Sequence, residues 1–589
     1  MKKFAKIVIG VFAGIALIMF IMYAVAVSYK KEILAVVTAD ISDRINGDIV
    51  IRDLSVTLLH DFPNISLSLN DISLRGPKYD KYRKDFLQAE VINLNVGAVA
   101  LLQRKINIKS IDIINGDIFI FRTKDGYTNL EVFKNEEGSD TTTIQSNQSS
   151  TVSFDAISFK NVRAAFIDSL KEKSFAANFT MVKSKMIHTD SSIHCHLVGG
   201  IDFEGLTFNA AKGSFLKDQH TQSDLNFEFF TPSKRLVIEP SSIMLDKSTI
   251  NITGVLQFFM PGGNFQLNIQ SDRLDFQEGL AVVTEHMRNS LQNFSIEKPL
   301  AINVRLKGEI GSRLRPLADV IFEVKNSSVT WRKLDLQNAF VQGTFTNHKD
   351  SLLATDDINS EIRLDSIKGI VKALPFKGAV SFNDLTNPFM DLNVVFDADL
   401  KKVNADMDTT RIWFTAGHFI SKVHFTGNLN EYFDESITKY HGKLKGSTEI
   451  TGGRLRYLPR KIIFDRINAS FQFTEKQFDI AEITMRMNKN PIKLSGIITG
   501  FVPFFLIPEK QGKVLLNVSS PSLDLTGMGG TTAKSNYDIK TVGKREKISN
   551  FIDSVYSKLE FGLAFKIGRL KSNKIEGNDL TGKVVLANN

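Results

Sequence analysis

Alternation of apolar and polar residues runs through most of this 589-residue chain and limits what it can fold into. Segments such as Ile65–Leu69, Leu225–Phe229 and Ile302–Leu306 place an apolar side chain at every second position. A period of two is that of a β-strand with one polar and one apolar face. The strand patterns follow one another without a regular helix between them, so the sequence predicts a mostly β fold built from antiparallel meanders.

The apolar faces of so many strands must be covered, and the residues allow three ways of doing so. A closed barrel, a sandwich and a long curled sheet would each hide them. Phenylalanine is unusually frequent, with 45 Phe beside 10 Tyr and 2 Trp. Tyr and Trp carry a polar O–H or N–H group that Phe lacks, so a preference for Phe indicates many wholly apolar surfaces. Either a large β core or a surface that holds hydrocarbon would explain it.

Turn-forming residues separate many of the strand patterns. Four such places are Asn46–Asp48, Asn115–Asp117, Pro261–Gly263 and Thr451–Gly453, which we expect to be turns.

Two of the strand patterns slip by one residue midway. Leucines 67 and 69 are followed by Ile72 and Leu74, and Ile106 and Ile108 by Ile111 and Ile113. A one-residue slip would turn the apolar set to the other face of a strand. We therefore expect a bulge or tight bend at Asn70–Asp71 and at Lys109–Ser110, which would keep the set on one face.

Helical periodicity is rare. Residues Ile548–Leu559 fit an amphipathic helix, Gln277–Leu291 fit one less well, and Val99–Leu102 could form a short turn. The polar stretch Asn135–Ser150 has neither periodicity and is typical of a flexible linker. We therefore divide the body into an N-terminal β region (32–134), the linker (135–150), a middle β region (151–435) and a C-terminal β region (436–589). The strand-like Lys583–Leu586 at the end suggests that the last region is truncated.

An uncharged run, Ile7–Tyr29, lies near the N-terminus. As a helix it would cover roughly 34 Å, enough for the hydrocarbon core of a bilayer. Lysines 2, 3 and 6 precede it, which favours a cytoplasmic N-terminus. The alternative is a cleaved signal peptide, since Ala24–Ala26 has the small-x-small form of a cleavage site, but the run is longer than a usual signal core. Residues 1–31 are thus predicted to be a cytoplasmic head and a single-pass transmembrane helix.

Charge and composition argue against several classes of function. Lys and Arg number 73 against 64 Asp and Glu, a net charge of +9 without a basic stripe, so nucleic acid is not an expected partner. The single cysteine excludes an intrachain disulfide and any multi-cysteine metal site. His194-Cys195-His196 is the one metal-like cluster, with Asp202 and Glu204 the nearest acids downstream, and we interpret it as a surface strand. No catalytic motif is present, so we expect no catalytic residue, metal or cofactor.

A family resemblance adds to this interpretation. The basic head and apolar span are followed in order by Ile45–Ile51, Asp61–Leu74, Leu87–Val96 and Ile106–Ile120. This order resembles the opening of the AsmA-like family of envelope proteins, whose relatives include TamB and YhdP. Later segments around Gly442–Gly446 and Lys493–Gly496 resemble the C-terminal repeats of that family.

The resemblance implies an inner-membrane anchor and a periplasmic body built as a long curled β-sheet. Its hydrophobic groove would carry phospholipid between the inner and outer membranes, as in chorein-type bridge proteins, and so support outer-membrane biogenesis. The candidate groove residues are Ile106, Ile108, Ile111, Ile113, Phe471, Phe473, Phe478, Ile480, Met485 and Met487. From the residues alone, the last six fit a sandwich core as well as a groove lining.

Two further interpretations remain open at this stage. Phe501, Phe504 and Phe505 surround a proline and form either an ordinary loop packed on the sheet or a lid or membrane-contacting tip. The protein could also be a structural or assembly factor that contacts outer-membrane or other envelope proteins without lipid cargo. A hydrolase with an unrecognised site is a remote third class.

Overall fold

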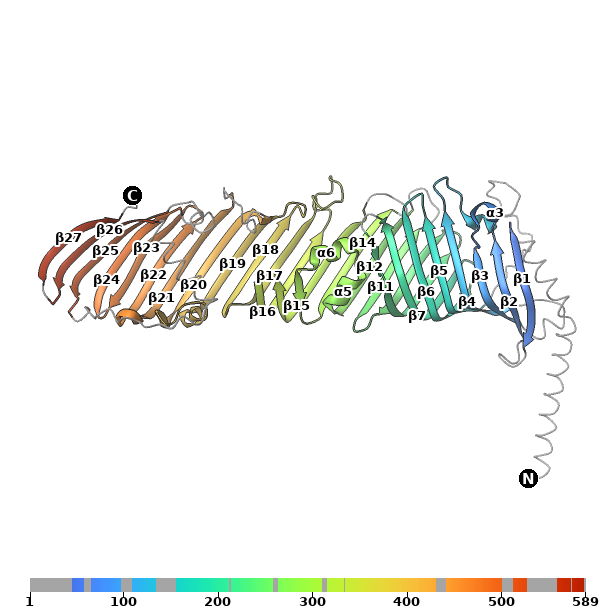
Figure 1. The fold of residues 1–589 in the computed structure, drawn as a ribbon, viewed down its shortest axis with the longest axis horizontal. Coiled ribbons are helices and arrows are strands. Elements are labelled where there is room, and N and C mark those ends of the chain that lie inside the picture. The colour runs from blue at the N-terminus through green and yellow to red at the C-terminus, as the bar shows by residue number, and fades with distance from the viewer. Residues whose placement is uncertain are drawn as a thin grey trace, which may run out of the picture. The chain divides into compact units, whose positions relative to one another are not determined.

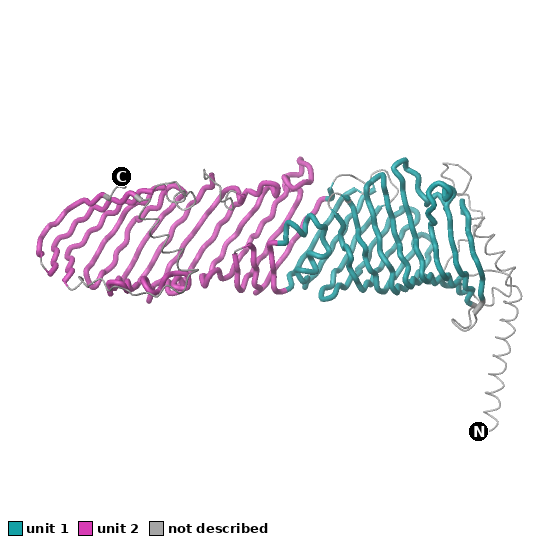
Figure 2. The backbone as a smooth tube through the Cα atoms, in the orientation of Figure 1, with its two compact units in different colours: residues 1–292, 299–316 teal, residues 293–298, 317–589 magenta. Residues whose placement is uncertain are grey.

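The computed structural model describes residues 45–57, 65–96, 108–133, 155–210, 213–257, 263–309, 315–332, 334–430, 441–500, 512–526, 559–573 and 575–586. These residues belong to two compact units, which Figure 2 shows in different colours. Unit 1 comprises the chain up to Gln292 together with Pro299–Pro316, and unit 2 comprises Asn293–Lys298 and the chain from Leu317 onward. Each unit contains a single hydrogen-bonded β-sheet.

The sheet of unit 1 follows the chain almost strand by strand (Figure 1). Its pairing order is β1-β2-β3-β4-β5-β6-β7-β9-β10-β11-β12-β14, and the short β8 pairs with the end of β7. The strands are β1 (Asp48–Thr57), β2 (Ile65–Arg75), β3 (Leu87–Val96), β4 (Ile108–Arg122), β5 (Ala156–Asp168), β6 (Lys173–His188), β7 (Ser192–Asn209), β8 (Gly213–Phe215), β9 (Gln219–Phe230), β10 (Arg235–Met244), β11 (Thr249–Gln257), β12 (Asn264–Leu274) and β14 (Leu300–Glu309).

Unit 2 repeats this plan. Strand β13 pairs with β15, and from β15 to β27 each strand pairs with the next. The strands are β13 (Phe294–Ile296), β15 (Leu317–Trp331), β16 (Leu334–Thr346), β17 (Glu361–Val371), β18 (Leu374–Asn383), β19 (Phe389–Asp399), β20 (Ile412–Asn428), β21 (Lys443–Tyr457), β22 (Ile462–Thr474), β23 (Gln477–Met487), β24 (Asn490–Thr499), β25 (Gly512–Asp524), β26 (Leu559–Lys571) and β27 (Glu576–Leu586).

These pairings confirm the predicted β class and decide among its three architectures. Within the described ranges β1 of unit 1 pairs only with β2, and β27 of unit 2 pairs only with β26, so neither unit closes its strands into a barrel. All the described strands of a unit lie in one sheet, so no second sheet is present among them to complete a sandwich. An open sheet with one apolar face remains.

The prediction of a wholly antiparallel sheet was wrong, because the sheet is mixed. Strand β4 pairs with β5 in parallel, and β25 pairs with β26 in parallel. Parallel neighbours require a long crossover connection, and both pairs flank the longest connections in the body. The predicted linker Asn135–Ser150 falls within the first connection and lies outside the described residues, while the strands on its two sides are hydrogen-bonded neighbours.

Both expected bends are present. Asp71 has a φ of 50°, which bends β2 between Leu69 and Ile72. In β4 the pairing with β3 shifts register between Ile108 and Ser110, so Lys109 is the extra residue of a bulge.

Two of the predicted turns were wrong. Asn115–Asp117 lies inside β4 and Thr451–Gly453 inside β21. Asn115 has a φ of 49° and Gly452 a φ of 61°, and the pairing of β21 with β22 shifts beside Gly452. Asn and Gly tolerate the left-handed conformation that turns need, and a bulge within a strand uses the same conformation.

The bend at Asp71 continues across neighbouring strands. Asn115 Nδ2 donates to Glu90 Oε2 at 2.5 Å, and Asn161 Nδ2 donates to Asn115 Oδ1 at 3.0 Å. Asn161 itself has a φ of 53°. Because β2, β4 and β5 each have a left-handed residue at this position, their apolar residues stay on one face on both sides of the bend.

The described helices are short: α3 (Tyr79–Tyr82), α5 (Phe276–Val282), α6 (Glu285–Leu291) and the 3₁₀ segments η1 (Asn129–Phe133), η3 (Leu400–Asp406) and η4 (Leu458–Arg460). Helices α5 and α6 confirm the expected helical stretch Gln277–Leu291. The stretch is divided at Thr284, whose side chain accepts a hydrogen bond from Met287 N and caps α6. The predicted helix Ile548–Leu559 and the turn Val99–Leu102 lie in ranges that are not described, apart from Leu559 in β26.

In the part of the chain that the structure describes, no helix is long and apolar enough to cross a membrane. The predicted anchor Ile7–Tyr29 lies outside that part.

Candidate functional site

The candidate groove residues of β22 and β23 lie side by side on one face of unit 2. Phe471 pairs with Ile480, and Phe473 pairs with Phe478 on the neighbouring strand. The ring centroids of Phe471 and Phe478 are 5.4 Å apart, and those of Phe473 and Phe478 are 5.9 Å apart in a stacked arrangement. These four side chains are half-buried.

A bulge brings the two methionines to the same face. Ile480 and Met485 differ in parity, so an unbroken strand would point them to opposite faces. The pairing of β23 with β24 shifts register between Ile480 and Ile483, which restores the face, and Met485 then pairs with Ile492. We call the face formed by Phe471, Phe473, Phe478, Ile480, Met485 and Met487 the C-terminal apolar face.

Glycines opposite the aromatic residues let their rings lie down on the sheet. A Cβ on Gly446 would lie 2.3 Å from Cζ of Phe473, its partner in the register. Gly582 and Phe565 repeat the arrangement, with a distance of 2.4 Å. Each of these two rings therefore covers bare backbone.

Charged side chains lie on the other face of these strands. Lys493 Nζ is 2.8 Å from Glu482 Oε1, and Arg486 Nε donates to Asp465 Oδ1 at 2.8 Å. Gln472 and Thr474, which alternate with the two phenylalanines of β22, are exposed. The two faces are thus chemically separated.

The candidate residues of β4 have different surroundings. Ile113 is only 6% exposed and belongs to a core cluster, against which Ile111 packs. This N-terminal cluster consists of Leu54, Leu67, Leu69, Ile72, Ala89, Ile92, Leu94, Val96, Ile113 and Val162. Ile108 is half-buried, and Ile106 lies outside the described residues, as do Phe501, Phe504 and Phe505. The structure thus brings the candidates together in two separate groups.

The His194-Cys195-His196 motif lies on β7, and its side chains alternate. His196 Nε2 is 2.8 Å from Asp224 Oδ1, and His194 Nε2 is 3.0 Å from Glu228 Oε1. Cys195 pairs with Phe227 on the apolar face, and burial raises the pKa of its thiol. The carboxylates beside the two histidines come from β9, more than twenty residues downstream, so the spacing within the motif did not reveal them.

A family model supports the resemblance seen in the opening segments. The model of the AsmA family matches residues 1–581. This chain belongs to the AsmA family. No curated protein and no solved structure is similar enough to the chain to count as a match.

Membership extends the resemblance from the opening segments to essentially the whole body. Membership agrees with open β-sheets that have one apolar face, and it points to the cell envelope.

Proposed function

We propose that this AsmA-family protein binds phospholipid on the C-terminal apolar face and moves it between the inner and outer membranes. In this proposal the body is periplasmic, Ile7–Tyr29 anchors it in the inner membrane, and the protein acts as a carrier rather than as an enzyme. Its activity supports outer-membrane biogenesis. The lining also includes Ile450 on β21 and Ile492 on β24, which pair with Ala469 and Met485.

The observation that carries the proposal is the incomplete burial of large apolar side chains. Phe471, Phe473 and Phe478 form a contiguous set at the positions that face away from the charged residues, yet they are only half-buried. In the core of a sandwich, side chains from a second sheet would cover them. A contiguous apolar surface that stays partly exposed is typical of a site that receives an apolar ligand or partner.

An acyl chain is the apolar partner with the right shape and chemistry. Burial of each CH₂ group is worth about 0.8 kcal/mol, so a lipid leaves its bilayer only for a comparably apolar surface. A row of rings and aliphatic side chains provides such a surface at every step. Because the ion pairs of Lys493 and Arg486 lie on the opposite face, an acyl chain on the apolar face would leave these charges hydrated.

Site-specific photo-crosslinking tests the proposal. A photoreactive residue at Phe471 or Phe473 is expected to capture phospholipid in cells, while one at Gln472 on the exposed face is not. Equal capture at all three positions would contradict the proposal, because it would indicate surface adhesion alone. Capture of envelope proteins with no lipid at any position would instead favour the assembly-factor function.

Introducing a charge on the apolar face provides a second test of the proposal. Phe473→Asp is expected to abolish lipid capture from a neighbouring photoreactive residue at Phe471, because an unpaired ion on the apolar face is costly to desolvate. Gln472→Asp is the matched control, with the same new charge on the exposed face and no expected loss. Circular dichroism of both purified variants checks that the β-sheet is retained.

A further inference from the structure

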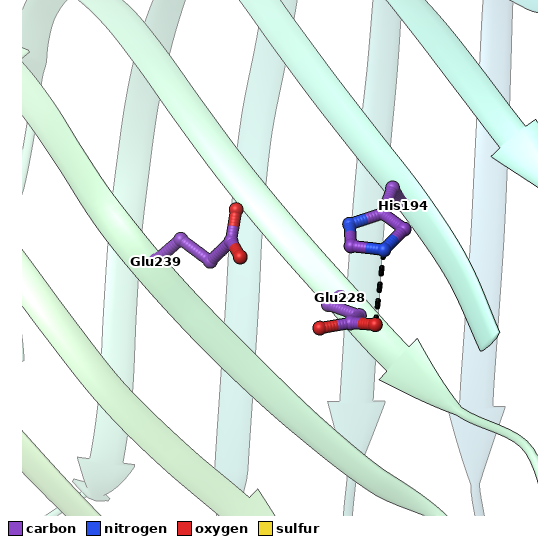
Figure 3. A group of neighbouring side chains, drawn as sticks. All are labelled: His194, Glu228 and Glu239. Atoms are coloured by element: carbon purple, nitrogen blue, oxygen red, sulfur yellow. Dashed lines mark ion pairs between the residues drawn. The ribbon is translucent and has the colours of Figure 1, made fainter.

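Three potential metal ligands meet on the polar face of unit 1, as Figure 3 shows. His194 comes from β7, Glu228 from β9 and Glu239 from β10, and one ligand atom from each lies within 4.8 Å of the other two. All three residues are half-buried. His194 Nε2 and Glu228 Oε1 form an ion pair at 3.0 Å, which Figure 3 draws as a dashed line.

The strand register and a bulge create this group. His194 and Glu228 are directly opposite each other in the pairing of β7 with β9. On β10 the pairing with β9 and with β11 shifts register after Ile238, which is the position next to Glu239. Ser241 Oγ holds the bulge by accepting a hydrogen bond from Asn226 N at 2.8 Å. A bulge changes the direction in which nearby side chains point. This bulge places Glu239 next to His194 and Glu228, which already form an ion pair with each other.

The charges of the group are unbalanced. Among the described residues the carboxylate of Glu239 has neither a hydrogen bond nor an ion pair, although it lies beside a second carboxylate. His194 is the only group of the three that can become positive. Two half-buried carboxylates in proximity repel each other, and a bound cation would remove that repulsion.

Other histidines on the described strands show what an ordinary surface pair looks like. His196 faces Asp224, His418 faces Asp397 and His424 faces Asp391, each at 2.8–3.1 Å. Within the described ranges only His194 has a second carboxylate, that of Glu239, close enough to share a metal ion. The third ligand therefore distinguishes this group from the general pairing of histidines with acids.

We propose that His194, Glu228 and Glu239 bind a divalent transition-metal ion of the zinc class. One imidazole nitrogen and two carboxylates are suitable zinc ligands, and three protein ligands leave a fourth position for water or a partner's side chain. Calcium and magnesium prefer six or more oxygen ligands, which this group does not supply. Tetrahedral zinc needs ligand atoms about 3.4 Å apart, so small side-chain rotations would close the site.

The site would link three strands that are neighbours in the sheet. Because an ion that binds only the folded protein raises its stability, zinc is expected to stabilise unit 1. The proposal concerns the polar face and does not depend on lipid binding.

Thermal unfolding of the purified, tag-free full-length protein with and without zinc chloride tests the proposal. Saturating zinc is expected to raise the unfolding midpoint of unit 1 by about 3 °C or more, while magnesium has no such effect. Isothermal titration calorimetry should show one zinc ion per chain at this site. Failure of zinc to bind, or binding with no effect on the midpoint, would overturn the proposal.

Two variants and a control assign the ligands. Glu239→Gln removes a carboxylate that has no other described partner, so the variant should fold normally and bind zinc at least about tenfold more weakly. His194→Gln should have the same effect. Asp224→Asn is the control, because it alters the neighbouring His196 pair and should leave zinc affinity unchanged. Unchanged affinity in both Glu239→Gln and His194→Gln would show that zinc binds elsewhere.

Discussion

The N-terminal cluster and the C-terminal apolar face are built from the same alternating pattern and differ in how completely they are covered. Leu54 and Leu67 in the N-terminal cluster have no exposed surface. Phe471 and Phe473, on the C-terminal apolar face of unit 2, are half-buried. An alternating pattern therefore defines a face of a sheet, but it does not tell how completely that face is covered.

The two regions differ in burial because their side chains, and the residues opposite them on the neighbouring strands, are of different types. In the N-terminal cluster, Leu69 pairs with Leu54 on one side and with Ile92 on the other, so aliphatic groups meet across three strands. On β21 and β22, Phe473 faces Gly446, which contributes no side chain. Aliphatic side chains on adjacent strands contact one another in the N-terminal cluster, whereas the Phe473 ring lies over a glycine that has no side chain to pack against it.

The largest expected effect is the loss of stability when a large apolar side chain is shortened to alanine in each of the two regions. Leu67→Ala should cost about 3 kcal/mol of unfolding free energy, because it removes buried methyl groups and leaves a cavity. Phe473→Ala should cost less, about 1–2 kcal/mol, since its ring is already partly in contact with solvent. Hydrogen exchange measured on peptides from β1–β3 and from β21–β23 would report each region separately. Equal losses of protection would mean that the two faces are equally filled.

A smaller effect is expected from filling the space below a ring. Gly446→Ala should cost about 1–3 kcal/mol, because its Cβ would lie 2.6 Å from Lys422 O as well as against the Phe473 ring. Gly577→Ala on β27 is the matched control, with its nearest contact at an ordinary 3.4 Å from Leu580 Cδ1. The thermal unfolding midpoint of each variant provides the comparison. A Gly446→Ala protein as stable as the control would show that the ring does not rest on the glycine.

The smallest effect concerns an ion pair on the polar face of unit 1. Arg163 donates to both carboxylate oxygens of Glu204, at 2.6 and 2.8 Å, and these bonds lower the pKa of Glu204. The folded-state pKa lies below the unfolded value of about 4.3, so the stabilisation is present above that pH and is lost as the pH falls through the lowered pKa. Both side chains are more than 40% exposed, so the contribution should stay below about 1 kcal/mol.

Urea unfolding of the wild type and of Glu204→Gln between pH 3 and pH 7 would measure this contribution. The difference between the two proteins should shrink toward acid pH. A difference that grows on acidification would have the wrong sign for a carboxylate with a lowered pKa.

The sequence by itself determined the class of fold and the composition of its two faces. Period-two alternation is a local property, because neighbouring side chains of a strand point to opposite faces whatever the strand pairs with. For the same reason the slips at Asp71 and Lys109 predicted real bends. The helical stretch Gln277–Leu291 was also recognisable from local periodicity.

Features that depend on contacts between residues far apart in the chain were decided only by the tertiary structure. The parallel pairing of β4 with β5, the role of Asn115 as a bend within a strand, and the meeting of His194 with Glu239 depend on register between strands. Register is set by contacts across the sheet, which spacing along the chain does not record. The incomplete cover of Phe471 and Phe473 has the same origin, since burial depends on everything that packs above a face.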